Sequence, residues 1–165
     1  MTAAAVRVFP GRAEEAGEAR RWVRVLAMAA CVLVADDAEI AAGELFANAV
    51  RHTRSGGVGG KVTAVVARYG EMVTVHMHDQ GTCDDRVPHP AGSGDERDLR
   101  LSGRGLQIVA AVCVRWGTVP ATWCPYAEAD DPAVAAFGRC TWCRLPVAAG
   151  REGRDEKEGV GRVRV

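Results

Sequence analysis

Two valine-rich runs separated by only two residues constrain the fold most. Lys61–Tyr69 and Met72–His78 are rich in β-branched residues, and the Gly70-Glu71 pair between them is typical of a tight hairpin turn. The runs therefore predict adjacent antiparallel strands. In the second run the apolar side chains occupy alternate positions, which places them on the face directed toward the core. Asp79 continues this inward alternation, which is unusual for a carboxylate.

Two helices are expected before the hairpin. The first covers residues 12–30, begins with acidic residues that suit the positive end of the helix dipole, and has an apolar stripe at helical spacing: Trp22, Val25, Leu26 and Ala29. Asp36 and Glu39 resemble a capping box, so the second helix should begin at Asp36 and end near Thr53. Its predicted buried face consists of Ala38, Ala41, Ala42, Leu45, Phe46 and Ala49.

The chain after the hairpin is less regular. Residues 82–101 are polar and without periodicity, which in a compact domain is typical of a lid or a binding loop. Residues 148–165 form a charged tail that we expect to be disordered. A third helix should open at Gly103-Arg104-Gly105, with an apolar side made of Leu106, Val109, Ala110 and Cys113. Further strands are expected at Val6–Phe9, Arg115–Val119 and Arg139–Val147.

Length and charge exclude several classes of protein. A chain of 165 residues provides one domain with a single core. The 21 basic and 21 acidic residues give a net charge of zero, and no basic stripe is present, so direct nucleic-acid binding is not expected. The longest apolar run, Val25–Ala35, is about half the length that a bilayer requires. The start lacks the apolar segment of a signal peptide, so we expect a cytoplasmic protein without membrane association.

The spacing of the histidines and cysteines gives only weak evidence for a metal-binding site. Cys140-Thr141-Trp142-Cys143 is the only CxxC of the sequence, and on a strand its two thiols would point to opposite faces. Zinc usually requires about four ligands, and no second pair is present. His76 and His78 have a spacing that can bind metal, but no third ligand is evident. We interpret the six cysteines as reduced packing residues and these histidines as surface residues.

Three polar residues line one edge of the second predicted helix. Glu44, Asn48 and His52 are spaced by four, so they follow one edge beside the apolar face. A carboxamide oxygen can ligate a hydrated magnesium ion, and a carboxylate one turn away can orient a water or a hydroxyl. The alternative interpretation is an amphipathic helix with a solvated polar edge.

Two further segments could contact a nucleotide. An inward Asp79 at the floor of a pocket can accept a hydrogen bond from an exocyclic amine such as that of adenine, and Gly81 would allow close approach to a ring. Gly103-Arg104-Gly105 precedes a helix, where free N–H groups bind anions and Arg104 adds a positive charge. Taken alone, Asp-x-Gly is also a common turn, and a single GxG is a weak signal.

The order of these motifs resembles the GHKL ATP-binding fold, which is shared by gyrases, heat-shock chaperones, histidine kinases and mismatch-repair ATPases. Glu44–Thr53 looks like its N box, His78–Gly81 like its first glycine box and Gly103–Leu106 like its second. Residues 6–147 are similar in particular to the stand-alone anti-sigma-factor serine/threonine kinases that are abundant in actinobacteria. The resemblance implies an α+β, two-layer sandwich, with a mixed, mostly antiparallel sheet covered on one face by helices.

The resemblance also implies ATP and Mg2+ as cofactors and a role for each motif residue. Glu44 would be the general base, Asn48 the Mg2+ ligand, and Asp79 with Gly81 the contacts to adenine. Residues 82–101 would form the ATP lid. The other residues expected at the nucleotide are His52 and, at its phosphates, Gly103, Arg104, Gly105 and Leu106.

Three positions depart from the family pattern. Cys83 stands where the first glycine box usually has a second glycine. The threonine that the family often has near adenine aligns with Cys140, although a shift of one residue would place Thr141 there. The segment 120–138 is longer than the family leads us to expect.

The resemblance leaves two main functions open, and a stand-alone histidine kinase is the weakest option because no dimerisation helix with a phospho-accepting histidine is present. The first is an ATP-dependent kinase that phosphorylates a serine or threonine of an anti-anti-sigma partner and sequesters a sigma factor when that partner is absent. The alternative is a nucleotide-dependent protein-binding module without significant phosphotransfer, which Cys83, Cys140 and the 120–138 segment favour. Members of the family often dimerise, so the resemblance also allows this chain to form a homodimer.

Overall fold

Five antiparallel strands form a single sheet in the computed structural model, which describes residues 4–82, 104–126 and 138–147. The order is β1-β2-β3-β5-β4, and every neighbouring pair is antiparallel. The predicted hairpin is confirmed: β2 and β3 pair up to Tyr69 and Met72, and Gly70 turns with a φ of 54°. The strands are β1 (Ala4–Pro10), β2 (Lys61–Tyr69), β3 (Met72–Asp79), β4 (Arg115–Pro120) and β5 (Arg139–Pro146).

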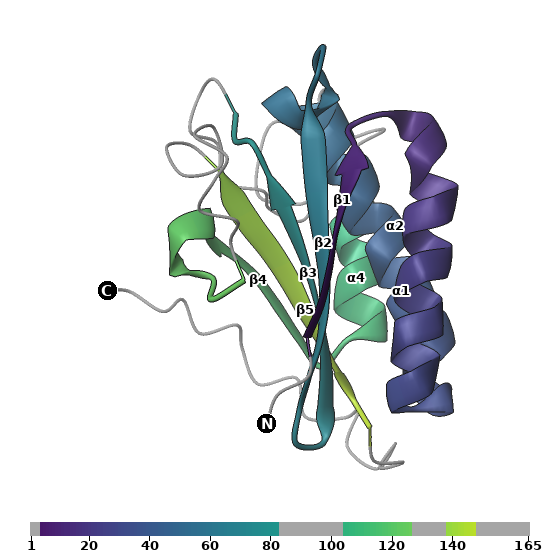
Figure 1. The fold of residues 1–165 in the computed structure, drawn as a ribbon. Coiled ribbons are helices and arrows are strands. Elements are labelled where there is room, and N and C mark those ends of the chain that lie inside the picture. The colour runs from purple at the N-terminus through teal and green to yellow at the C-terminus, as the bar shows by residue number, and fades with distance from the viewer. Residues whose placement is uncertain (1–3, 83–103, 127–137, 148–165) are drawn as a thin grey trace.

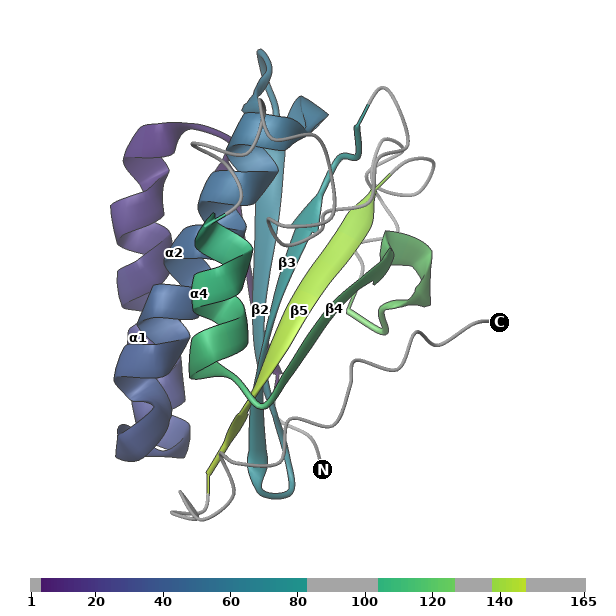
Figure 2. The same ribbon diagram turned by 180° about the vertical axis from the view of Figure 1, so that it is seen from behind.

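Among the described residues, three α-helices cover one face of this sheet, as Figures 1 and 2 show from opposite sides. They are α1 (Ala16–Ala30), α2 (Ala35–His52) and α4 (Arg104–Val112). α2 contacts both α1 and α4 and packs on β3, so it occupies the middle of the helical layer. The predicted α+β, two-layer architecture is therefore confirmed. Within the described ranges, no helix combines the length and the apolar character needed to cross a bilayer.

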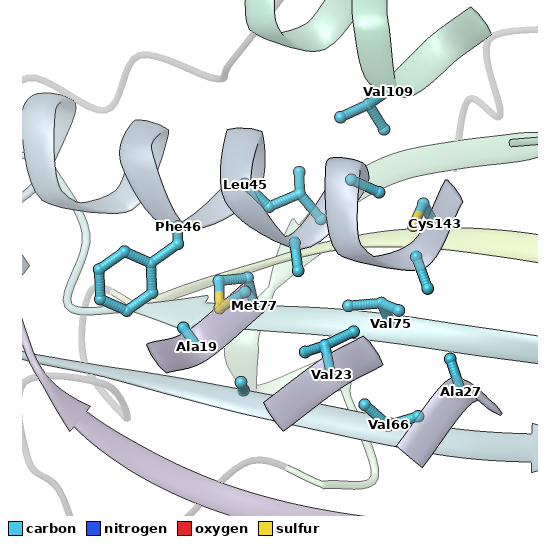
Figure 3. Close-up of a cluster of buried hydrophobic side chains, with 14 of the residues drawn as sticks. Ala19, Val23, Ala27, Leu45, Phe46, Val66, Val75, Met77, Val109 and Cys143 are labelled. Carbon is cyan, nitrogen blue, oxygen red and sulfur yellow. The ribbon is translucent and has the colours of Figure 1, made fainter. Parts of the chain in front are cut away.

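The hydrophobic core lies between the helices and the sheet (Figure 3). Leu45 and Phe46 of α2 are at most 2% exposed, and the Phe46 ring meets that of Phe9 edge-on at a centroid distance of 6.0 Å. Val75 and Met77 of β3 are buried beneath the helices. Burial of such apolar surface is the main favourable contribution to folding. The face predicted for α2 is confirmed, because all six of its residues are buried: Ala38, Ala41, Ala42, Leu45, Phe46 and Ala49.

The apolar stripe predicted for the first helix is largely wrong. α1 follows a short 3-10 turn, η1 (Ala13–Glu15), and Val25 on it is 58% exposed. Ala29 is also exposed, whereas Trp22 and Leu26 pack only partly against the core. The buried residues are small and spaced by four: Ala19, Val23 and Ala27. These three small side chains join the hydrophobic core between the helices and the sheet, so the buried side of α1 is formed by them instead of by its larger apolar residues.

The capping box predicted at Asp36 is also wrong. α2 begins at Ala35, directly after the 3-10 turn η2 (Val32–Val34), and no side chain caps its N-terminus. Asp36 and Glu39 instead accept hydrogen bonds from the guanidinium of Arg24 on α1, at 2.6 and 3.5 Å. The two carboxylates therefore link α1 to α2.

The last strand lies inside the sheet. β5 pairs with both β3 and β4, so the final strand of the chain separates two earlier ones. As predicted, the thiols of the CxxC point to opposite faces: Cys143 joins the core, whereas Cys140 lies across from His78 on the face without helices. The 3-10 turn η4 (Ala121–Trp123) follows β4 on that same face (Figure 1). The expected tail, residues 148–165, lies outside the described residues.

Candidate functional site

One edge of α2 carries the polar residues of the predicted N box. The buried side chains of Leu45 and Phe46 fix the rotation of the helix about its axis. Glu44 and Asn48 are consequently half-buried at the border of the apolar face, where a polar group can meet both the interior and a ligand. His52, the last residue of α2, is exposed. The predicted edge therefore exists, and it runs from a half-buried carboxylate to an exposed imidazole.

The start of α4 lies directly against this edge. A Cβ atom on Gly105 would be 2.6 Å from Oε2 of Glu44 and 3.6 Å from Oδ1 of Asn48. Real side chains essentially never pack at the first of these distances, so any residue other than glycine would displace the carboxylate. Gly105 thus brings the start of the described part of α4 next to Glu44 and Asn48.

Asn48 also has an unsatisfied group at this contact. Its Nδ2 atom is buried and finds no hydrogen-bond partner in the described part of the chain. Buried amides are normally satisfied, so the position is suited to an additional polar group. Carboxamide and carboxylate oxygens are also the ligands that Mg2+ prefers. Asn48 and Glu44 together therefore have the chemistry to hold a hydrated Mg2+ ion that accompanies a phosphate group.

Asp79 is a buried carboxyl group at the end of β3. It is 4% exposed, and it continues the inward alternation of Val75 and Met77, as predicted. Burial raises the pKa of Asp79 to about 6, against the opposing effect of the Gly81 N–H group, which donates a hydrogen bond to Oδ1 at 2.7 Å. Gly81 adopts a positive φ of 76°, a conformation that favours glycine. A desolvated carboxyl group of this kind can accept a hydrogen bond selectively from a ligand N–H.

A short turn connects this carboxyl group to the end of α2. The 3-10 turn η3 (Arg54–Gly56) follows the helix, and its Ser55 is fully buried. Ser55 Oγ accepts a hydrogen bond from the Gln80 N–H at 3.0 Å, and the Arg54 N–H donates to the Gly81 carbonyl at 2.8 Å. The turn that follows the N box is therefore joined to the first glycine box by one hydrogen bond to a side-chain hydroxyl and one between main-chain groups. No local pattern in the sequence indicates the role of Ser55, because that role depends on a contact between distant segments.

Strand register decides which residue of β5 faces the helical side. Thr141 pairs with Met77, whereas Cys140 pairs with His78 on the opposite face. Thr141 is 7% exposed, and its hydroxyl oxygen lies 3.1 Å from that of Thr118 on β4. Cys140 therefore lies on the opposite face of the sheet from Asp79, so the register disagrees with the alignment of the family's threonine position with Cys140. The residue of β5 on the same face as Asp79 is Thr141.

The predicted phosphate-binding segment is described only in part. Arg104 is the first residue of α4 and is exposed, so its guanidinium is accessible to an anion. Leu106 is 4% exposed within the core, so its side chain anchors α4 and only its main chain can serve a ligand. Gly103, Cys83 and residues 83–101 of the expected lid lie outside the described residues.

Comparison with known proteins agrees with this arrangement. The family model of the histidine kinase-like ATPase domain matches residues 9–115, which is more than half of the chain. The match includes α2 with Glu44 and Asn48, β3 with Asp79, and α4 with Gly105. No curated protein matches the sequence.

Proposed function

Because the chain belongs to the histidine kinase-like ATPase domain family, an ATP-binding family, we propose that it transfers the γ-phosphoryl group of ATP to a serine or threonine of a regulatory partner protein. The observation that carries this proposal is the contact of Gly105 with Glu44 and Asn48. This contact brings a carboxylate, a carboxamide and the N-terminus of α4 side by side. Phosphoryl transfer requires groups of these kinds to position the nucleophile, the metal ion and the phosphates.

In this proposal Glu44 acts on the partner's hydroxyl group. The hydroxyl oxygen attacks the γ-phosphorus while its proton passes to the Glu44 carboxylate. The bond between the γ-phosphorus and the β–γ bridging oxygen breaks, and ADP leaves with that electron pair. Asn48 would ligate Mg2+, which neutralises negative charge on the phosphates when it is bound.

The adenine end is assigned to the other half of the site. The buried carboxylate of Asp79 would accept a hydrogen bond from the adenine amino group, and Gly81 would let the main chain approach the ring. Thr141 supports this assignment, because it presents a buried hydroxyl on the same face of the sheet. The N-terminus of α4 with Arg104 and Gly105 would hold the phosphates, and His52 would lie at the open end of the N box.

The proposed partner is an anti-anti-sigma protein, and the proposed output is control of a sigma factor. This choice rests on the resemblance of residues 6–147 to the anti-sigma-factor kinases. A nucleotide-dependent protein-binding module remains the competing function. Cys140 no longer favours it, since Thr141 takes the position on the helical face.

The experiment separates transfer from binding. Purified full-length protein, Mg2+ and γ-labelled ATP are incubated with a panel of anti-anti-sigma proteins, and label on each candidate partner is measured. Glu44→Gln should lower the transfer rate about 100-fold or more while ATP binding is retained. Glu71→Gln, which changes an exposed carboxylate at the hairpin turn, is the matched control and should transfer normally. ATP binding without labelling of any partner would overturn the kinase proposal and favour the binding module.

A further inference from the structure

Four metal-binding side chains converge on the sheet face opposite the three described α-helices. They are His76 and His78 of β3, Cys140 of β5, and Cys124, which follows η4. Each offers one ligand atom, and within the described ranges these four atoms lie within 4.8 Å of one another. None of the four has a role in the ATP site, which lies on the helical face of the same sheet.

Strand geometry explains how the β-strand residues meet. His76 and His78 alternate with the buried core residues of β3, so both point away from the helices. Cys140 is the register partner of His78 on β5, and directly opposed Cβ atoms in an antiparallel pair are about 5 Å apart. The two histidines and this cysteine are therefore held by a rigid, hydrogen-bonded scaffold.

The fourth residue reaches the cluster because the chain turns back after β4. η4 folds over the helix-free face (Figures 1 and 2), and the Cys124 N–H donates to the Ala121 carbonyl at 2.9 Å. The segment continues to Tyr126, whose ring packs edge-on against His76 at a centroid distance of 5.4 Å. Cys124 is 6% exposed, so its thiol is directed into the cluster and shielded from water.

The distances within the cluster match those between ligands of tetrahedral zinc. Cys124 Sγ lies 3.2 Å from Nε2 of His78 and 3.6 Å from Nδ1 of His76, and Cys140 Sγ lies 3.5 Å from the same Nδ1. Zn–S bonds of about 2.3 Å and Zn–N bonds of about 2.0–2.1 Å at tetrahedral angles separate neighbouring ligand atoms by about 3.3–3.8 Å. A single ion at the centre can thus reach all four atoms with little movement.

The surroundings also orient the ligands. Thr74 Oγ1 lies 3.1 Å from Nε2 of His76. If that nitrogen carries the proton, the lone pair of Nδ1 points toward the two thiols, as in metal sites where an outer group fixes the imidazole tautomer. His78 is 1% exposed, so the prediction that it is a surface residue is wrong. Cys140 is also fully buried. Burying this many polar groups together is costly unless a partner compensates them.

We propose that His76, His78, Cys124 and Cys140 bind one Zn2+ ion as a structural site. Two thiolates and two imidazoles complete a tetrahedral shell and leave no open position, which is typical of structural and not catalytic zinc. The ion would fasten the segment Ala121–Tyr126 to the sheet. This gives a function to the described part of the 120–138 segment, and it is independent of the proposed kinase activity.

The test uses the full-length protein. Zinc content after purification and reconstitution with ZnCl2 should be one equivalent per chain, and Co2+ in its place should give the thiolate charge-transfer and visible bands of a tetrahedral site. Cys140→Ser and His76→Gln should each lower zinc affinity at least about 10-fold. Cys31→Ser, whose thiol donates to the Val147 carbonyl outside the cluster, is the matched control and should keep one equivalent.

The Co2+ spectrum of the wild-type protein keeps the test valid if a variant fails to fold. Removal of zinc by a chelator should lower the melting temperature, and added Zn2+ should restore it. Absence of stoichiometric zinc after reconstitution, or a Co2+ spectrum without thiolate bands, would overturn the proposal. A Cys124–Cys140 disulfide found by mass spectrometry in reduced preparations would overturn it as well.

Discussion

Gly105 and Glu44 are in such close contact that a single carbon atom added to the glycine would fall 2.6 Å from Oε2 of the carboxylate. The two residues lie on different helices, α4 and α2, and are far apart in the sequence. The contact therefore fixes the first turn of α4 relative to the polar edge of α2. In the proposed function it aligns the phosphate-binding helix with the base.

Gly105→Ala should impair ATP-dependent phosphotransfer more than it impairs folding. The new methyl group must push the Glu44 carboxylate aside, and Glu44 is a flexible side chain, so the cost in stability should be small. Displacement of a base by about 1 Å can reduce a rate about 100-fold. The measurement compares the phosphotransfer rates and melting temperatures of the wild-type and Gly105→Ala proteins.

Gly17→Ala is the matched control for this substitution. Gly17 is also helical, but a Cβ there meets nothing within 4 Å, so the change should leave transfer unaltered and stabilise the protein by up to about 1 kcal/mol. Equal loss of transfer in the two alanine variants would contradict the role given to the Gly105–Glu44 contact.

Asp79→Asn should weaken the discrimination between ATP and ITP. A carboxylate accepts a hydrogen bond from the adenine amino group but repels the carbonyl oxygen that replaces it in ITP, whereas an asparagine amide can donate to that oxygen. Loss of a hydrogen bond to a charged group corresponds to a change of roughly 10- to 100-fold in the ratio of the affinities for ATP and ITP. Calorimetric titration with each nucleotide measures this ratio.

The same variant also distinguishes a binding role from a structural one. Because burial raises the pKa of Asp79 to about 6, the carboxylate is desolvated at neutral pH, and its replacement by a neutral isostere should not destabilise the nucleotide-free protein. An Asp79→Asn protein that melts well below the wild type, with unchanged nucleotide preference, would show that Asp79 serves the fold alone.

Thr141→Val should lower ATP affinity, whereas Thr141→Ser should retain it. Valine preserves the shape of the side chain but removes the hydroxyl, which lies 3.1 Å from that of Thr118 on the face shared with Asp79. Removing one neutral hydrogen bond costs about 1 kcal/mol, or about fivefold in affinity. Titrations of both variants provide the test; indistinguishable affinities for valine and serine would remove Thr141 from the nucleotide site.

Asp36→Ala should destabilise the protein by less than about 1 kcal/mol, and the effect should shrink in high salt. The Asp36 side chain is 80% exposed in its ion pair with Arg24, so the attraction is largely screened by water. A helix cap would behave differently, since its loss costs typically about 1 kcal/mol and does not involve Arg24. Denaturant unfolding of Arg24→Ala, Asp36→Ala and the double variant measures the coupling free energy between the two side chains. If the changes in unfolding free energy simply add, the two side chains do not form a stabilising ion pair.

Much of the site could be predicted from the sequence because its signals are local. The spacing of Glu44 and Asn48 is a property of one helix, and the inward alternation of Asp79 is a property of one strand. The order of these motifs along the chain then indicated the family. The choice between Cys140 and Thr141 stayed open, because a one-residue shift reverses the face of a strand and only pairing with β3 fixes the register.

The amino-acid sequence by itself determined the hairpin, the buried face of α2 and the placement of the candidate nucleotide-binding residues on one helix edge and one strand face, since periodicity and turn chemistry act over a few residues. Only the tertiary structure decided that α1 buries Ala19, Val23 and Ala27 and that Gly105 lies against Glu44. It also gathered His76, His78, Cys124 and Cys140 into one cluster, although His76 and Cys140 are 64 positions apart. Such contacts depend on strand register and on the path of connecting segments, so no local pattern encodes them.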